Sequence, residues 1–271
     1  MKDKIVLVTG ATSGIGLVAA RALAAQGATV ILHGRDPRKT AAVAATVPGK
    51  VETVIADLSS LAAVRTLAAE VKQRFPRLDV LLNNAGAINS KRIVTVDGLE
   101  LSFAVNHLAH FLLTRELLPM LGPGSRIVNV ASEASRAAKL DFTDLQSERG
   151  YSGWTAYATS KLENILFTFE LARRLPKGVT ANALHPGAVA SNFAQNASWM
   201  GVAWKLLAPF LRSEEKGART SIYLASSPEV EGVTGKYFMD CREKRARKDA
   251  YDAELARKLW DASEQLSSSA R

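Results

Sequence analysis

The octapeptide Thr9-Gly10-Ala11-Thr12-Ser13-Gly14-Ile15-Gly16 carries the strongest indication of how this chain folds. It follows Lys4–Thr9, an apolar run typical of a strand buried on both faces, and it precedes Ile15–Gln26, an alanine-rich helical pattern that stops at Gly27. Glycines let a backbone approach an anion, and the free N–H groups and dipole of a helix N-terminus favour negative charge. The spacing G-x-x-x-G-x-G differs from the general dinucleotide fingerprint G-x-G-x-x-G. We therefore predict a phosphate-binding turn, with an ordinary glycine-rich turn as the alternative.

Strand and helix patterns alternate along the rest of the chain. Further strands are predicted at Ala28–His33, Val51–Ala56, Val80–Asn83, Arg126–Ala131, Val179–Leu184 and Gly235–Met239. Helices are predicted at Pro37–Thr46, Leu61–Phe75, Gly98–Leu118, Trp154–Leu175 and Glu214–Ala225. The alternation predicts an α/β fold, a single Rossmann-type doubly wound parallel sheet flanked by helices on both faces. No Pro/Gly/Ser-rich linker divides the chain, so residues 1–271 are expected to form a single domain.

Composition narrows the class of protein and its compartment. A hydrophobic fraction of 47% is typical of a soluble globular enzyme. Cys241 is the only cysteine, which excludes an intrachain disulfide and fits a reducing compartment. The N-terminal residues run directly into an apolar segment that is too short for a signal sequence or a membrane span. We therefore expect a cytoplasmic protein without an integral membrane anchor.

The net charge of +9 raises the question of an anionic partner. Part of the excess lies in a basic run that contains Arg242, Lys244, Arg245, Arg247 and Lys248. Such a run can bind nucleic acid or an anionic membrane, but no helix-turn-helix, zinc or aromatic stacking pattern accompanies it. We interpret it as a solvated surface segment and expect no nucleic-acid partner.

The end of the second strand, His33-Gly34-Arg35-Asp36, indicates which dinucleotide is bound. An NAD site typically places an acid here to hold the ribose 2′-hydroxyl. Arg35 instead offers a planar cation suited to a 2′-phosphate, and Asp36 before Pro37 is typical of a helix N-cap. We predict NADP(H) as the preferred cofactor and keep NAD(H) as the alternative.

Two further segments follow the third and fourth predicted strands, namely Asp57-Leu58 and Asn83-Asn84-Ala85-Gly86. The Asp57 carboxylate can accept a hydrogen bond from an adenine amino group, or it can cap the next helix in competition with Ser59 and Ser60. Small residues after the fourth strand let a flat ring or a ribose lie against the backbone. The alternative for one Asn of the pair is a buried amide that ties neighbouring strands together.

Tyr157-Ala158-Thr159-Ser160-Lys161 combines a proton donor with a cation one helical turn away. A free tyrosine has a pKa of about 10, and a nearby cation lowers that pKa by roughly one to three units. General acid–base catalysis needs a pKa near the operating pH. The spacing therefore predicts acid–base machinery in which Lys161 lowers the pKa of Tyr157.

Together these motifs resemble the short-chain dehydrogenase/reductase family over nearly the full chain. They occur in the order T-G-x-x-x-G-x-G at Thr9–Gly16, N-N-A-G at Asn83–Gly86, Ser132, Y-x-x-x-K at Tyr157–Lys161 and P-G at Pro186-Gly187. A narrower similarity to the retinol-dehydrogenase-like branch rests on Asp97–Glu100, Phe103–Phe111, Ser160–Asn164, Gly235–Phe238 and Leu259-Trp260. Retinol dehydrogenases are commonly anchored to membranes at the N-terminus, and soluble relatives share these motifs, so the resemblance does not imply a retinoid substrate.

The resemblance implies a proton-relay tetrad of Asn106, Ser132, Tyr157 and Lys161. In it Tyr157 exchanges a proton with the substrate oxygen and Ser132 forms a hydrogen bond to that oxygen. Lys161 lowers the pKa of Tyr157 and holds the nicotinamide ribose. Asn106 positions a water through its helix backbone. Motifs and resemblance together predict cofactor contacts at Gly10, Thr12, Ser13, Gly14, Ile15, Gly16, Arg35, Asp57, Leu58, Asn84, Ala85, Gly86, Tyr157, Lys161, Pro186, Gly187, Val189 and Ser191.

Several polar residues near the tetrad have other interpretations. Ser135 is the alternative to Ser132, and the strand-end position favours Ser132. His107 and His110 share the helix of Asn106 and are predicted to be packing residues. His185 is interpreted as structural. No cluster has the ligand set of a zinc site, so no metal is predicted.

Two segments bear on substrate and partners. Residues 188–212 follow a predicted strand at the edge where α/β sheets bind ligands, and we expect them to cover the active site as a lid. Their aromatic and aliphatic residues predict an apolar substrate wall, with packing on the domain or contact with a membrane as the alternatives. The tail 249–266 is predicted to be helical, and its stripe of Tyr251, Leu255 and Leu259 packs on the same subunit or on a partner.

The sequence therefore predicts an NADP(H)-dependent oxidoreductase that interconverts a carbonyl, an apolar ketone or aldehyde, and an alcohol by hydride transfer. The first alternative is a reductase of an activated C=C bond, and the second is a non-catalytic NADP(H)-binding sensor or interaction module. The intact tetrad favours an enzyme over the sensor. The resemblance also implies a homo-oligomer, a dimer or tetramer, formed through the helices that hold Asn106 and Tyr157.

Overall fold

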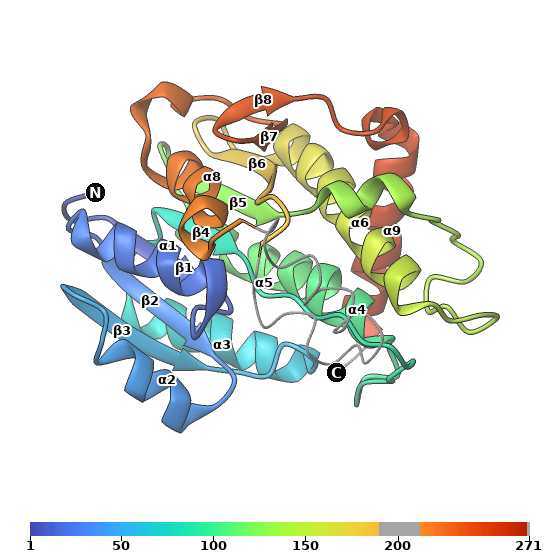
Figure 1. The fold of residues 1–271 in the computed structure, drawn as a ribbon, viewed down its shortest axis with the longest axis horizontal. Helices are drawn as coiled ribbons and strands as arrows, with labels where there is room; N and C mark the ends of the chain where they lie inside the picture. The colour runs from blue at the N-terminus through green and yellow to red at the C-terminus, as the bar shows by residue number, and fades with distance from the viewer. Residues whose placement is uncertain (190–211, 270–271) are drawn as a thin grey trace.

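The computed structural model describes residues 1–189 and 212–269. Within these residues the strands form one eight-stranded sheet in the order β3-β2-β1-β4-β5-β6-β7-β8 (Figure 1). Strands β1 to β7 pair in parallel, and β8 runs antiparallel to β7. The strand order reverses between β1 and β4, the point at which doubly wound sheets bind ligands. The predicted Rossmann-type architecture is confirmed.

Every strand predicted from the sequence is present, with its ends shifted by one residue at most. The strands are β1 Ile5–Val8, β2 Thr29–Gly34, β3 Lys50–Ile55, β4 Val80–Asn83, β5 Arg126–Val130, β6 Thr180–His185, β7 Lys236–Met239 and β8 Arg242–Lys244. The α-helices are α1 Gly14–Ala25, α2 Pro37–Ala44, α3 Leu61–Arg74, α4 Leu101–Phe103, α5 Ala109–Leu117, α6 Gly153–Arg174, α8 Glu214–Ser226 and α9 Ala253–Ser269.

Strand β8 was not predicted, because it lies in the basic run that we interpreted as a solvated segment. Asp240 and Cys241 have positive φ angles of 53° and 58° and form the short turn that joins β7 to β8. Neither residue is a glycine or asparagine, so the usual signal of a hairpin turn is missing. The side chains of β8 are exposed as expected. Arg247, however, is partly buried and donates hydrogen bonds to backbone carbonyls within Ser135–Ala138, so the solvated interpretation is wrong there.

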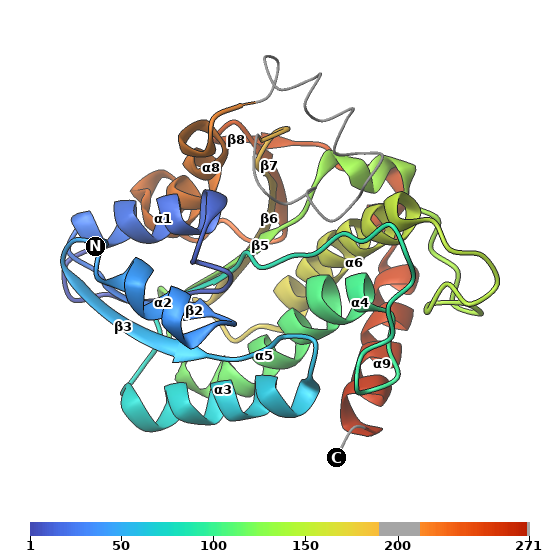
Figure 2. The same cartoon turned by 60° about the horizontal axis from the view of Figure 1, so that its bottom comes forward.

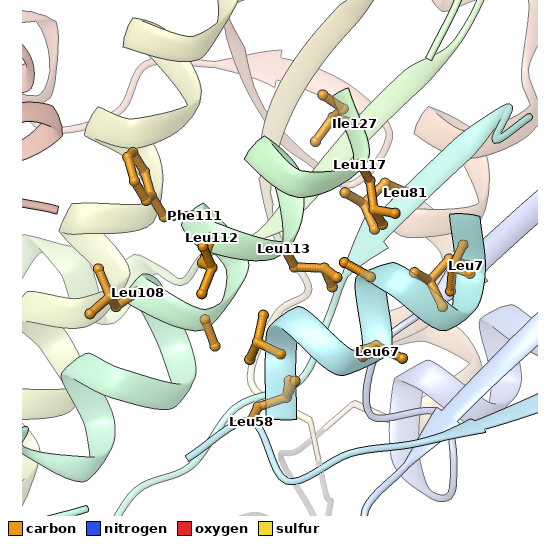
Figure 3. Packing of buried hydrophobic residues seen from close by; sticks show 14 of the residues in the cluster. Leu7, Leu58, Leu67, Leu81, Leu108, Phe111, Leu112, Leu113, Leu117 and Ile127 are labelled. Atoms are coloured by element: carbon orange, nitrogen blue, oxygen red, sulfur yellow. The ribbon is translucent and has the colours of Figure 1, made fainter. Parts of the chain in front are cut away.

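Helices cover both faces of the sheet (Figure 2). The core on one face joins β-strand side chains such as Val128 to α1 and α8. The core on the other face joins a different set of strand side chains, such as Leu81, to α3, α5 and α6. Figure 3 shows the second core from close by, with Leu7 and Leu81 of the sheet packed near Leu67 of α3 and Leu117 of α5. These two packed layers hold the carboxyl ends of the parallel strands at one common edge.

The helix predicted at Gly98–Leu118 is divided. It begins at Leu101, because Gly98 has a φ of 77° and the Glu100 side chain caps the first turn by accepting from the Phe103 N–H. The next turn, Ala104–Leu108, is π-helical and precedes α5. Single π-helical turns often occur at functional sites, and this one contains Asn106.

Helix α9 forms an outer layer against α6 (Figure 2). Leu259 is fully buried in that contact, and the Tyr251 ring lies 5.2 Å from the Phe169 ring, centroid to centroid. The apolar stripe of the tail therefore packs on its own subunit, one of the two predicted alternatives. In the part of the chain that the structure describes, no helix is long and apolar enough to cross a bilayer.

Candidate active site

Most of the predicted site residues lie at the carboxyl edge of the parallel strands. Gly10 follows β1, Arg35 follows β2, Asp57 follows β3, Asn84 follows β4 and Ser132 follows β5. Segments far apart in the sequence thus meet at one edge, on either side of the switch point between β1 and β4. This is where open α/β sheets bind their ligands.

The predicted phosphate-binding turn has the geometry that an anion needs. Gly10 and Gly14 have positive φ angles of 64° and 60°, and a Cβ atom on Gly16 would lie 2.6 Å from the Gly10 oxygen. Ser13, the N-cap of α1, makes no side-chain hydrogen bond to the first turn, which also has no acidic residue. Helices α2, α3, α6 and α8 are each capped by a side-chain oxygen. The first turn of α1 therefore fits the pyrophosphate of a dinucleotide.

Thr9 and Asn84 join the glycine turn to the segment that follows β4. The Thr9 hydroxyl oxygen accepts from the N–H groups of Asn84 and Ala85, at 2.8 Å and 3.0 Å. The Asn84 amide donates back to the Thr9 carbonyl at 2.8 Å. A Cβ atom on Gly10 would lie 2.9 Å from the Ala85 Cα, so the two segments approach as closely as a glycine allows. Sequence reasoning missed the role of Thr9, because its partners are distant in the chain.

Asn83 has the structural role that was the alternative for one residue of the pair. It is fully buried, and its amide donates to Thr114 Oγ1 at 3.0 Å and to Asn129 Oδ1 at 2.8 Å. The Asn129 amide in turn donates to Thr168 Oγ1 at 2.9 Å. This chain of amides ties β4 and β5 to α5 and α6. Asn83 thereby fixes the strand that positions Asn84.

The end of β2 brings its cation beside the glycine turn. A Cβ atom on Gly34 would lie 2.5 Å from Thr12 Cγ2, so Thr12 packs directly on this strand end. Arg35, the next residue, is exposed. The Asp36 carboxylate accepts from the Lys39 N–H at 2.9 Å, which confirms Asp36 as the N-cap of α2. Arg35 is thus an exposed cation at the end of β2, beside the glycine turn.

Asp57 and Leu58 follow β3 in different environments. The exposed Asp57 carboxylate accepts from the Ser59 N–H at 2.9 Å, and Ser60 is the N-cap of α3. The Leu58 side chain is buried in the core with α3 (Figure 3). The predicted contact of Leu58 with a cofactor is therefore limited to its backbone, because its side chain is part of the core.

The side chains of Ser132, Tyr157 and Lys161 meet beyond the end of β5. Tyr157 and Lys161 lie one turn apart on α6, and the Tyr157 side chain is hydrogen-bonded to Ser132. The Lys161 Nζ lies 5.6 Å from the centroid of the Tyr157 ring and donates to the Val130 carbonyl at 3.0 Å. Ser135, the alternative serine, is buried. The preference for Ser132 therefore agrees with the contact to Tyr157.

The pKa values of this pair differ from the sequence-based expectation. Burial raises the pKa of Tyr157 to about 12, against a smaller lowering by the hydrogen bond with Ser132. Burial lowers the pKa of Lys161 to about 8. The predicted net lowering of the Tyr157 pKa is therefore wrong for the protein's own groups, because desolvation of the phenolate outweighs the lowering by the hydrogen bond with Ser132. At neutral pH Tyr157 is a phenol, the form that donates a proton.

Asn106 holds the segment after β4 against the helices. Its side-chain oxygen accepts from the Ala87 N–H at 2.6 Å, and its amide donates to the Ala87 carbonyl at 2.9 Å and to Ser160 Oγ at 2.8 Å. The backbone carbonyl of Asn106 accepts from His110 Nδ1 at 3.0 Å. Asn106 therefore links the π-helical turn to α6, one residue before Lys161.

His107 and His110 are buried and neutral. Burial lowers the pKa of His107 and of His110 to about 3. His107 bonds to Ser263 Oγ of α9 at 2.8 Å, which confirms it as a packing residue. His110 lies 3.2 Å from Thr9 Oγ1, so it connects the turn of Asn106 to the glycine turn, beyond mere packing. His185 Nδ1 accepts from the Glu133 N–H at 3.2 Å, in agreement with a structural role.

The segment after β6 supplies the remaining predicted contacts. Pro186 is partly buried, and Gly187 has a φ of 89° with Arg212 against its backbone. A Cβ atom on Gly217 would lie 2.5 Å from Val189 and 2.8 Å from Ile15, so Val189 and Ile15 meet over α8. Ser191 and most of the predicted lid lie outside the described residues.

Sequence reasoning also missed Gly153, the first residue of α6. A Cβ atom there would lie 1.9 Å from the Asn89 carbonyl oxygen, a distance that no side chain tolerates. The neighbouring Tyr151 hydroxyl donates to the same carbonyl at 3.0 Å. The start of the Tyr157 helix is thus fixed against the segment that follows β4. Within residues 1–189 and 212–269, no three His, Cys, Asp or Glu side chains are grouped to hold a metal ion.

Comparisons with known proteins identify the family of this chain. A family model described as short chain dehydrogenase matches residues 4–200. Retinol dehydrogenase 14 of Homo sapiens is 44% identical over 293 residues, covering 97% of this chain and 86% of the human protein. The DnrU protein of Streptomyces sp. (strain C5), whose name proposes a daunorubicin C-13 ketoreductase, is 42% identical over 268 residues, covering 97% and 92%.

A solved structure extends the similarity to the fold. The crystal structure of a short chain dehydrogenase from Burkholderia cenocepacia J2315 in complex with NADP has a TM-score of 0.71 and 28% identity, covering 88% of this chain and 96% of that chain. The match of the family model and the identity to curated relatives both extend over most of the sequence. This chain therefore belongs to the short-chain dehydrogenase/reductase family, in its retinol-dehydrogenase-like branch.

Proposed function

We propose that the protein is an NADP(H)-dependent oxidoreductase that interconverts an apolar ketone or aldehyde and the corresponding alcohol, with Tyr157 as the general acid and base. The observation that carries this proposal is the contact of Tyr157 with Ser132 and Lys161 at the strand edge that also bears the glycine turn. A proton donor, a hydrogen-bond partner for the same oxygen and a cation then lie at the same strand edge as the proposed pyrophosphate-binding turn.

The residues of the site fit NADP(H). The glycine turn and the uncapped first turn of α1 suit the pyrophosphate, and the exposed Arg35 suits a 2′-phosphate. One oxygen of the Asp36 carboxylate is engaged in capping α2, which favours Arg35 over Asp36 as the partner of the ribose. The NADP complex of the Burkholderia cenocepacia relative supports the same choice. When bound, the nicotinamide supplies or accepts the hydride.

The protein's own groups handle the proton. In reduction, the Tyr157 hydroxyl gives its proton to the carbonyl oxygen, and Ser132 donates a hydrogen bond to that oxygen as negative charge develops. Lys161 stabilises the phenolate that Tyr157 becomes, and its bond to Val130 keeps the ammonium beside the ring. Asn106 holds α6 against the π-helical turn and so keeps Lys161 in register. Oxidation follows the reverse sequence.

An apolar substrate is favoured by the surroundings of Tyr157. The Trp154 ring lies 6.1 Å from the Tyr157 ring, centroid to centroid, and is 42% exposed. Such a ring offers a flat apolar surface beside the proton donor. The names of two relatives refer to retinol and to daunorubicin. We therefore expect bulky apolar aldehydes and ketones to be better substrates than small charged ones.

The test is the consumption of NADPH with a panel of carbonyl compounds by the wild type and by Tyr157→Phe. The wild type should reduce bulky apolar members, with a higher kcat/KM for NADPH than for NADH, and the variant should lose activity while it retains NADPH binding. Turnover confined to small charged compounds would contradict the substrate class. Retained activity in Tyr157→Phe would contradict the proton-transfer role.

The two alternatives differ in their products. Mass spectrometry of the product separates reduction of a carbonyl from reduction of an activated C=C bond. A wild-type protein that binds NADPH but turns over no member of the panel would support the sensor. The contact of Tyr157 with Ser132 and Lys161 favours the enzyme, because a binding module needs no proton donor at this position.

A further inference from the structure

His33 is a buried imidazole next to the nucleotide end of the site. It lies near the end of β2, two residues before Arg35, and only 3% of its surface is exposed. Its Nδ1 accepts from the Gly10 N–H at 3.1 Å, and its Nε2 lies 3.1 Å from the Ala56 carbonyl oxygen. One ring therefore bonds the glycine turn after β1 and the end of β3 at once.

These two partners fix the tautomer of His33. The Gly10 N–H can only donate, so Nδ1 is the unprotonated nitrogen. The Ala56 carbonyl can only accept, so Nε2 carries the proton. A doubly protonated ring would point an N–H at the Gly10 N–H and lose that bond. The arrangement therefore requires a neutral imidazole.

The two bonded segments are those that the proposed cofactor meets. Gly10 begins the turn that faces the proposed pyrophosphate, with a φ of 64° in the left-handed region that favours glycine. Ala56 directly precedes Asp57, the candidate partner of the adenine. We propose that His33 is a positioning residue, which sets the distance between the pyrophosphate-binding turn and the segment that meets the adenosine. This inference rests on the proposed NADP(H) site.

The charges around His33 agree with a neutral ring. Burial lowers its pKa to about 4, which outweighs the raising effects of the Ala56 hydrogen bond and of the Asp57 carboxylate. The other titratable group that faces it is His110 of α5, which is itself neutral because burial lowers its pKa to about 3. Since the folded pKa lies below the ordinary 6.5, the unfolded chain takes up a proton that the folded chain does not as the pH falls from 6.5 to 4. His33 thus adds acid sensitivity to the stability of the protein.

The test compares two substitutions by calorimetric titration of NADP⁺ at pH 7.5. His33→Asn keeps an acceptor where Nδ1 lies, and His33→Phe keeps a ring but leaves the Gly10 N–H unpaired. We expect the Kd for NADP⁺ to rise about tenfold in His33→Phe and by less than about threefold in His33→Asn, as expected for an orphaned buried donor and its rescue. His107→Phe is the matched control, because it removes a buried histidine that bonds α9, and its Kd should equal that of the wild type.

The same measurements separate this inference from the proposed function. A wild type that does not bind NADP⁺ contradicts the NADP(H) site itself. A wild type that binds NADP⁺ with the same Kd as His33→Phe leaves the site intact and overturns the role of His33. A loss of affinity in His107→Phe equal to that in His33→Phe also overturns it, because the effect would then be one of general stability.

Two further measurements use the holoenzyme without any turnover. Nitrogen NMR of the imidazole should show His33 as the Nε2–H tautomer at pH 7 and still neutral at pH 5. The pH dependence of the unfolding free energy between pH 4.5 and 6.5 should correspond to one proton fewer in His33→Asn than in the wild type. An Nδ1–H tautomer, or an unchanged proton count, overturns the proposal.

Discussion

The ammonium group of Lys161 lies 5.6 Å from the centre of the Tyr157 ring, held there by a hydrogen bond to the Val130 carbonyl. Because Val130 is the last residue of β5, this bond ties the cation to the strand that leads to Ser132. Lys161 is almost fully buried, so its charge is kept near Tyr157 against a desolvation penalty. Placing a cation beside the proton donor therefore lowers the stability of the fold.

Lys161→Met is predicted to abolish turnover and to stabilise the protein. Burial lowers the pKa of Lys161 from 10.5 to about 8, so the folded state at pH 7 bears the cost of a buried charge. Removing that charge should raise the unfolding free energy at pH 7 by about 2 kcal/mol. The Val130 carbonyl keeps a partner, since the Asn164 amide donates to it at 3.3 Å. Urea unfolding and carbonyl reduction check the two effects.

The pH dependence supplies the control for Lys161→Met. Between pH 8 and 10.5 the unfolded wild type holds a proton on Lys161 that the folded state has released, so wild-type stability rises with pH in that window. The variant lacks this rise, and the two stabilities should converge above pH 10. A variant that is less stable than the wild type at pH 7 would show that the cation contributes more to the fold than its burial costs.

The rate of carbonyl reduction is predicted to fall as the pH rises through about 8. Tyr157, whose pKa burial raises to about 12, stays a phenol over the whole range from pH 6 to 10. Lys161 loses its charge near pH 8 and no longer stabilises the phenolate left by proton transfer. The measurement is kcat/KM for the carbonyl at saturating NADPH. A plateau that extends to pH 10 would exclude Lys161 as the titrating group.

The neighbours Asn83 and Asn84 are predicted to differ when each is changed to Ala. Asn83→Ala removes two hydrogen bonds inside the core and leaves Thr114 Oγ1 and Asn129 Oδ1 without the donor that Asn83 supplies. It should therefore lower the unfolding free energy by about 2–3 kcal/mol. Asn84→Ala removes the side-chain hydrogen bond to the Thr9 carbonyl at the start of the glycine turn. It should raise the Kd for NADP⁺ about tenfold, with a smaller loss of stability. Chemical unfolding and calorimetric titration of both variants measure this contrast. Equal losses of NADP⁺ affinity would contradict the division of roles.

Most of the fold could be predicted from local patterns, because the spacing of apolar residues along the sequence distinguishes buried strands from amphipathic helices. The glycine turn and the N-cap Asp36 were predicted for the same reason, since both act within one segment. The tie of Asn83 to Asn129 and the contact of Gly153 with Asn89 depend on the strand order, which no local pattern contains. The predicted direction of the Tyr157 pKa shift was wrong, because the sequence spacing shows the nearby cation but not how deeply the phenol is buried.

Glu163→Gln is predicted to stabilise the protein clearly at pH 8 and much less at pH 5. Glu163 is 1% exposed, and burial, with the charge of Glu100 nearby, raises its pKa well above 4.5. The folded state keeps a proton that the unfolded state loses above pH 4.5, so wild-type stability declines as the pH rises. Glutamine mimics the protonated acid and removes this decline. Urea unfolding at both pH values measures the difference.

Glu170→Gln on the same helix is the matched control for Glu163→Gln. Burial tends to raise the Glu170 pKa, but hydrogen bonds from Arg174 and Arg173 outweigh it and hold that pKa below its ordinary value. Its contribution is present above pH 4.5 and is lost as the pH falls through the lowered pKa, so Glu170→Gln should destabilise the protein at pH 8. The same sign of effect for both variants at pH 8 would contradict the buried, protonated state of Glu163.

Trp260→Ala is predicted to weaken the fold and to promote association between copies. The Trp260 ring lies 5.0 Å from the Phe111 ring and under the Arg174 guanidinium at 4.5 Å, so it fastens α9 over α5 and α6. Its removal should cost about 3–5 kcal/mol, the range for deleting a buried aromatic ring, and Trp260→Phe should cost less. Both costs are read from chemical unfolding of the full chain.

The position of α9 also decides how copies can pair. The sequence implied an oligomer through the helices that hold Asn106 and Tyr157, yet α9 of the same chain packs on α6 and contacts the π-helical turn through Ser263. A second copy can reach that face only by displacing α9. Light scattering should therefore show a larger oligomeric fraction in Trp260→Ala than in the wild type. An equal fraction in both proteins would mean that any contact between copies lies on another surface.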